Sequence, residues 1–169
     1  MICHGQASFG KADYDQLSEK GMQQAEILGK HWQLFATPDK FFSGDLLRHG
    51  QTLKYFSAGH QIENIPTIIH SGFNEFDHVD ILTCYNEQWH NFAEMSFEIN
   101  QLKNSNKNFQ KEFARALNRW ISGDFDTEYK ESWPQFKERC LRALRDIIQQ
   151  TLASNRQANA NNVKPIKDI

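Results

Sequence analysis

The sequence predicts an α/β domain in which a mostly parallel sheet carries helices on both faces. Short runs of apolar and β-branched residues, at 41–43 and 65–70, alternate with segments whose apolar residues recur at helical spacing. The length of 169 residues suits one domain with a core of its own. A net charge of −2 with mixed charges argues against a nucleic-acid-binding surface.

The chain opens with two apolar residues and then Cys3-His4-Gly5, a pattern typical of a histidine presented by a strand. Gly5 has no Cβ, so another group can approach the imidazole ring closely. These residues alone favour a plain loop histidine. His4 becomes a candidate nucleophile only together with later segments.

A helix is predicted from about residue 18 to 35, because apolar residues recur on one side of this segment. Ser18 is a suitable N-cap, and Glu19 suits the first turn. Pro38 prevents the helix from continuing.

Residues 41–43 predict a short buried strand, and Ser43 is expected to cap a second helix. Arg48 would lie near the positive end of that helix, which is unfavourable unless an anion sits between the two. This makes Arg48 a candidate phosphate ligand. The alternative is a surface arginine paired with Asp45, and His49 is expected to be a partly exposed helix residue.

Residues 65–70 predict a strand that runs into a loop. We call residues 71–77 the acid loop, because Glu75 and Asp77 flank Phe76 there. Apolar neighbours raise the pKa of a carboxyl group, which suits a general acid. A solvated turn is the alternative.

The remainder predicts a helical insertion at about 86–122, whose aromatic residues are expected to be core rather than a ligand platform. Gly123 should end it. A further helix is expected to open at Ser132-Trp133-Pro134, with Pro134 in its first turn. Its apolar residues, Phe136, Cys140, Leu141, Leu144, Ile147, Ile148 and Leu152, predict a buried stripe, and residues 154–169 a polar tail.

Three distant cysteines, an odd number, indicate reduced thiols and a cytoplasmic protein. No apolar run reaches the roughly 18 to 20 residues that span a bilayer, and no secretion signal is visible. His78, Cys84 and His90 do not have a usual zinc spacing, so no metal site is expected. The oligomeric state stays undecided.

Taken together, the segments resemble the histidine phosphatase superfamily, which contains the phosphoglycerate mutases, and specifically its small bacterial phosphatase-like members. That family has an Arg-His-Gly start, a Leu-Ser/Thr-x-x-Gly-x-x-Gln-Ala helix start, a Ser-x-x-x-x-Arg-x-x-Gln-Thr segment and a glutamate loop. The resemblance covers about residues 2–153, with four motifs in the family's order: Cys3-His4-Gly5, residues 17–25, residues 43–52 and Asn74-Glu75-Phe76-Asp77.

The resemblance implies hydrolysis of a small phosphorylated substrate through a phosphohistidine on His4, without metal or cofactor. Arg48 would bind the phosphoryl group, Glu75 would act as the acid, and Gln6 and Ser8 would be minor phosphate contacts.

The chain departs from the family at Cys3, where the family has arginine, and no histidine follows His90 to supply the family's distal motif. The ends look degenerate or truncated, so activity is expected to be weakened. The alternative is a non-catalytic relative that binds phosphorylated ligands or a protein partner.

Overall fold

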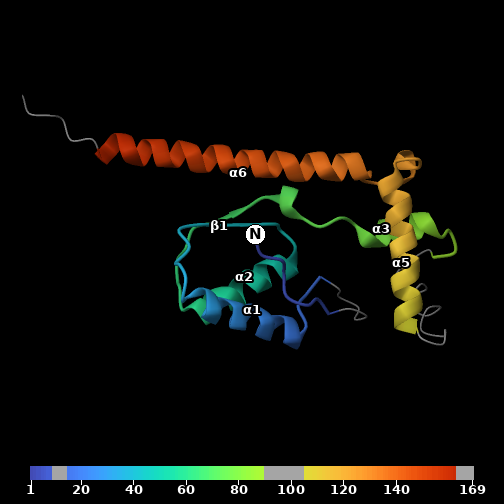
Figure 1. Ribbon diagram of the computed structural model, residues 1–169, viewed down its shortest axis with the longest axis horizontal. Coiled ribbons are helices and arrows are strands. Elements are labelled where there is room, and N and C mark those ends of the chain that lie inside the picture. The colour runs from blue at the N-terminus through green and yellow to red at the C-terminus, as the bar shows by residue number, and fades with distance from the viewer. Residues whose placement is uncertain (9–14, 90–104, 163–169) are drawn as a thin grey trace, which may run out of the picture.

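The computed structural model describes residues 1–8, 15–89 and 105–162. Helices α1 (Glu19–Trp32) and α2 (Leu47–His60) pack against each other, and strands β1 (Phe41–Ser43) and β2 (Thr67–Ile69) form a parallel two-stranded sheet. Figure 1 shows α6 (Trp133–Asn162) running on the other side of the strands from α1 and α2. The predicted α/β class is confirmed, although the sheet within the described residues is small.

Glycines bring α1 and α2 into backbone contact. A Cβ added at Gly29 would overlap the carbonyl oxygen of Phe56, and one at Gly59 would overlap the carbonyl oxygen of Glu26. The predicted cap of α1 is confirmed, because the Ser18 hydroxyl accepts the N–H of Gly21 at 3.1 Å. The helix ends at Trp32, a few residues earlier than predicted.

The predicted cap of α2 is wrong. The helix begins at Leu47, after an N-cap residue that makes no side-chain cap, and the Ser43 hydroxyl donates to the carbonyl of Gly44 instead. The carboxylate of Asp15 takes the capping role by accepting the N–H groups of Leu47 at 2.9 Å and Arg48 at 3.4 Å. A carboxylate that is remote in the sequence therefore caps the N-terminus of α2, and the local sequence does not reveal this cap.

The acid loop joins β2 to α3 (His78–Tyr85) through the short 3-10 helix η1 (Ser71–Phe73). Asp77 ends the loop as the N-cap of α3, since its carboxylate accepts the N–H groups of Val79 and Asp80. The loop is thus fixed at both ends by regular structure.

Helix α5 (Ser105–Ser122) carries Phe109, Phe113 and Trp120 of the predicted insertion, and Trp120 is 1 % exposed, whereas residues 90–104 of the insertion lie outside the described residues. Their interpretation as core is confirmed where they are described, since they pack with α3 in one apolar cluster. Gly123, with φ +81°, follows the end of α5 as predicted, and η2 (Asp126–Glu128) leads to α6. His90 lies outside the described residues.

Helix α6 begins at Trp133 as predicted, but its predicted buried stripe is largely wrong. Leu141 is 47 % exposed, and Leu144, Ile148 and Leu152 are exposed as well. Among the residues of α6 whose burial is described, Ala143 is buried, and its methyl group lies against Gly72 of η1. Among the described helices, none combines the length and apolarity required to cross a bilayer.

Candidate functional site

His4 lies in an N-terminal segment that contacts both α1 and α2. The N–H of Gly5 donates to the Thr52 hydroxyl at 3.2 Å, and the carbonyl of Gln6 accepts the N–H of Ser18 at 2.9 Å. A Cβ at Gly5 would overlap the carbonyl of Gly21, so this close approach requires glycine. The expected strand does not form in residues 1–8, where an isolated antiparallel bridge joins Ala7 to Leu17.

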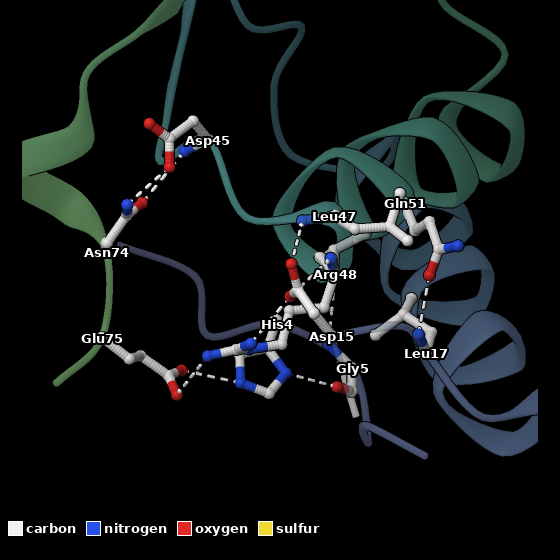
Figure 2. Close-up of polar contacts among 11 residues, drawn as sticks. His4, Gly5, Asp15, Leu17, Asp45, Leu47, Arg48, Gln51, Asn74 and Glu75 are labelled. Atoms are coloured by element: carbon white, nitrogen blue, oxygen red, sulfur yellow. Dashed lines mark hydrogen bonds and ion pairs between the residues drawn. The ribbon is translucent and has the colours of Figure 1, made fainter. Parts of the chain in front are cut away.

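The imidazole of His4 is held at both nitrogens (Figure 2). Nδ1 lies 2.5 Å from the carbonyl oxygen of Gly5, and Nε2 lies 2.7 Å from Oε1 of Glu75. The hydrogen bond to Glu75 raises the pKa of His4, against the opposing effect of burial. Nε2 and the carboxylate therefore share one proton between them.

The pKa of Glu75 moves in the opposite direction from the one predicted. The hydrogen bond from His4 lowers it to about 2, and the charges of His4 and Arg48 act in the same sense. Burial by neighbouring apolar groups raises it by less. The resting site thus holds an ionised glutamate beside a proton-bearing histidine.

Arg48 is the third member of the cluster, and its side chain is only 6 % exposed. Its Nη1 donates to Asp15 Oδ1 at 2.7 Å, and its Nη2 donates to Glu75 Oε2 at 3.1 Å. The alternative pairing with Asp45 is therefore wrong. The anion expected between Arg48 and the start of α2 is the carboxylate of Asp15, which binds both.

His49 is partly exposed, as predicted, and its ring centroid lies 6.0 Å from that of His4. Its buried Nδ1 makes no hydrogen bond within the part of the chain that the structure describes. Burial first, and then the charge of Arg48, lower the pKa of His49. His49 therefore contributes a neutral ring beside the cluster.

The acid loop is held by hydrogen bonds from Asp45, which precedes α2, and from Arg139 on α6. Asn74 and Asp45 exchange two hydrogen bonds, one from the Asp45 N–H at 3.0 Å and one from Asn74 Nδ2 at 2.5 Å. From α6, Arg139 Nη1 donates to the carbonyls of Ser71, Gly72 and Asn74 at 3.0 to 3.3 Å. These bonds fix the backbone that presents Glu75 to His4.

Arg139 is itself oriented by a bidentate ion pair. Its Nε and Nη2 donate to the two carboxylate oxygens of Glu131 at 2.6 and 2.8 Å. The planar guanidinium is thus held with Nη1 directed at the loop carbonyls. Arg139 links the position of α6 to the position of Glu75.

The structure brings together three of the five predicted site residues, namely His4, Arg48 and Glu75. Gln6 is exposed, and its main-chain N–H donates to Gln24. Ser8 is 4 % exposed, and its main-chain N–H donates to the Gln16 carbonyl. Gln24 lies within α1, and Gln16 lies in the segment that leads into it.

Sequence reasoning missed Asp15 and Arg139, and it named Asn74 as part of a motif without predicting its contact with Asp45. For Asp15 a signal existed, since an arginine at a helix N-terminus demands an anion, but nothing in the sequence identified which carboxylate supplies it. The contacts of Arg139 reach a loop far away in the chain, so no local pattern could reveal them.

The arrangement places an imidazole, a carboxylate and a guanidinium within one hydrogen-bonded cluster. A thiol lies beside them, since ligand atoms of Cys3, His4 and Glu75 all lie within 4.8 Å of one another. Such a cluster can bind a phosphoryl group through Arg48 and attack it from His4.

Residues 1–84, about half of the chain, match the family described as "Histidine phosphatase superfamily (branch 1)". The match contains His4, Arg48 and Glu75. A comparison with curated proteins finds no match.

Proposed function

Because the chain belongs to the histidine phosphatase superfamily, we propose that it hydrolyses small phosphomonoesters through a phosphohistidine on His4. The observation that carries this proposal is the contact of His4 and Arg48 with the same carboxylate, that of Glu75, at 2.7 and 3.1 Å. A nucleophile, an acid and a phosphate-binding cation are the groups that such a reaction needs.

In the first half of the reaction, His4 Nε2 forms a bond to phosphorus while the bond from phosphorus to the ester oxygen breaks. The proton shared by His4 and Glu75 passes to Glu75 and then to the departing oxygen, so an alcohol leaves. The bond between His4 Nδ1 and the Gly5 carbonyl keeps the ring oriented with Nε2 toward the substrate.

In the second half, water attacks phosphorus and the bond to Nε2 breaks. Glu75 accepts the proton from the water, phosphate leaves, and the starting protonation state returns. Arg48 neutralises charge on the phosphoryl oxygens in both halves. Gln6 and Ser8, in the segment after His4, are assigned as minor phosphate contacts.

Activity is expected to be weak. Loss of one preorganised charge-stabilising donor costs about 10²- to 10³-fold in rate, and Cys3 stands directly before His4, where the family has arginine. Because residues of a catalytic site act as a unit, this range is only an order of magnitude. Arg48 must also exchange part of its pairing with Asp15 and Glu75 for substrate.

Cys3, at the position where the family has arginine, favours a second candidate function. A site without that cation suits a non-catalytic relative that binds a phosphorylated ligand or a protein partner without turnover. The two functions differ in one measurable respect, because only the enzyme forms a covalent bond between phosphorus and His4.

The test is hydrolysis of an aryl phosphate by the wild type and by His4→Ala, with His31→Ala as the control on the exposed end of α1. The proposal requires turnover that disappears only in His4→Ala, and an acid-labile phosphoryl group trapped on the wild type. Equal background rates in all three proteins would reject it. Cys3→Arg should increase the rate if the remaining site is correctly built.

We assign residues 1–153 to one phosphatase-like domain, with the insertion at about 86–122 and residues 154–169 as its tail. The free thiols of Cys3, Cys84 and Cys140 suit a reducing compartment, which supports the cytoplasm as the location. The substrate is a small phosphorylated molecule in this proposal.

A further inference from the structure

Cys3, His4 and Glu75 place three kinds of metal ligand at one point. A thiol, an imidazole and a carboxylate each offer an atom, and these atoms lie within 4.8 Å of one another. We propose that the three side chains form a binding site for a divalent ion of borderline softness, such as Zn²⁺, with its fourth position open. The N-terminal segment supplies two ligands and the acid loop supplies the third.

The donor set determines the class of ion. Mg²⁺ and Ca²⁺ prefer oxygen ligands throughout, whereas thiolate and imidazole suit Zn²⁺ and its neighbours in the first transition row. Three protein ligands with one open position are a common arrangement for accessible zinc sites. Cys3 is exposed and His4 is half-buried, so an ion from solution can reach both.

The hydrogen bonds of His4 identify the donor nitrogen. Nδ1 is engaged by the Gly5 carbonyl at 2.5 Å, which leaves Nε2, directed at Glu75, as the ligand. A ligating histidine usually donates its other N–H to a carbonyl or carboxylate in this way. The ring is therefore oriented for the ion in advance.

The geometry needs small adjustments. Ligands of tetrahedral Zn²⁺ lie about 3.3 to 3.8 Å from one another, given bond lengths of about 2.0 to 2.3 Å. The contact of 2.7 Å between His4 Nε2 and Glu75 Oε1 must widen as the ion replaces their shared proton. The exposed Cys3 side chain must also approach the other two ligands, since the three ligand atoms now lie within 4.8 Å of one another.

The surrounding charges favour a cation. Arg48 donates to the second carboxylate oxygen of Glu75 at 3.1 Å, but Asp15 pairs with Arg48 at 2.7 Å and offsets its repulsion of the ion. A thiolate and the carboxylate of Glu75 together neutralise a divalent ion. Cys3 stands where the family has arginine. A guanidinium, which would repel the ion, is thus replaced by a thiol that can bind it.

Binding would have a clear consequence, which rests on the proposed function. The ion occupies the lone pair of Nε2 that would attack phosphorus, and it also takes the carboxylate that would carry the proton. Metal binding and phosphoryl transfer are therefore mutually exclusive. The site would act as a metal-dependent brake on hydrolysis.

The test uses the full chain, stripped of metal and kept reduced by a phosphine, and titrates it with Co²⁺ and then Zn²⁺. We expect one Co²⁺ per chain, with thiolate-to-cobalt charge transfer and the absorption of a tetrahedral ion. Cys3→Ser should abolish the charge-transfer band and weaken Zn²⁺ binding by at least about 10-fold. Cys140→Ser, which removes a thiol on α6, should behave like the wild type.

Glu75→Gln provides a second variant, which should keep the charge-transfer band but bind more weakly. A band that survives in Cys3→Ser, or equal Zn²⁺ affinity in the wild type and Cys3→Ser, would overturn the proposal. Hydrolysis of the aryl phosphate without any Co²⁺ binding would reject the metal site and support the phosphatase proposal. Co²⁺ binding without hydrolysis by the metal-free protein would support the metal site and reject the phosphatase proposal.

Discussion

Replacing Glu75 with glutamine should reduce stability most within a defined pH window. The lowered pKa of Glu75 means that its stabilising contribution is present above its ordinary pKa of 4.5 and is lost as the pH falls toward about 2. The raised pKa of His4 gives the opposite sign: that contribution is complete below 6.5 and is lost as the pH rises through the folded-state value. The pair therefore stabilises most between 4.5 and 6.5.

The magnitude follows from the Glu75 pKa. A fall from 4.5 to about 2 corresponds to roughly 3 kcal/mol, at about 1.4 kcal/mol for each tenfold change in the ionisation constant. The carboxylate is 39 % exposed, however, so solvent screening reduces this figure substantially. We expect Glu75→Gln to lose about 1 kcal/mol within the window. Part of the loss persists above it, because the guanidinium of Arg48 stays charged.

The assay is urea unfolding of the metal-free wild type and Glu75→Gln across the pH range, followed by tryptophan fluorescence. Glu63→Gln is the matched control, since Glu63 is an exposed carboxylate in the loop between α2 and β2. The pKa of His4, measured by NMR, should fall in Glu75→Gln and stay constant in Glu63→Gln. A stability difference that does not vary with pH would refute the ion-pair reasoning.

Three further predictions concern the scaffold. Gly59→Ala should destabilise the protein by about 1 to 3 kcal/mol through overlap with α1, whereas Gly50→Ala, with open space around the position, should stabilise it by up to about 1 kcal/mol. Thermal and urea unfolding of both variants would check this, and equal effects would contradict it. Asp15→Ala should lower the free energy of unfolding by about 1 to 2 kcal/mol, and Asp15→Asn should lower it by less, because the amide oxygen still caps α2. Unfolding curves in which Asp15→Asn is the less stable variant would exclude the capping role. Arg139→Met should lower kcat about 10-fold or more with little change in KM, because Arg139 fixes the loop that presents Glu75. The pKa of His4, measured by NMR, should fall in the same variant. Arg142→Met, on the exposed side of α6, should change neither kcat nor this pKa. An Arg139→Met protein with both values intact would show that the loop needs no anchor from α6.

The parts of the fold that the sequence predicted well depend on local chemistry. Ser18 caps α1 through a bond to Gly21 three residues later, and the short apolar runs at 41–43 and 67–69 form the two strands. Ser43 has the same type of side chain, yet it caps nothing, because Asp15 already binds the first N–H groups of α2. Local propensity identifies suitable residues and cannot show when a remote group takes their place.

Periodicity has a similar limit. The spacing of Leu141, Leu144, Ile148 and Leu152 correctly places them within one helix, but they are exposed because no other described element covers that part of α6. An apolar stripe indicates which residues share a face and does not supply a partner for it. Contacts between distant segments decide burial, and these contacts are absent from a local pattern.

For the site, the resemblance indicated which residues should meet but not how they pair at rest. His4, Arg48 and Glu75 do lie together, yet the apolar neighbours of Glu75 suggested a raised pKa, whereas contact with two cations lowers it. The protonated form of Glu75 that could donate to a leaving group is therefore disfavoured until His4 transfers its proton and substrate displaces Arg48 from the carboxylate. An ionised carboxylate is a poor acid but a suitable metal ligand. The proposed hydrolysis and the proposed metal binding therefore compete: an anionic phosphomonoester would engage Arg48, whereas a divalent cation would engage Glu75 and His4.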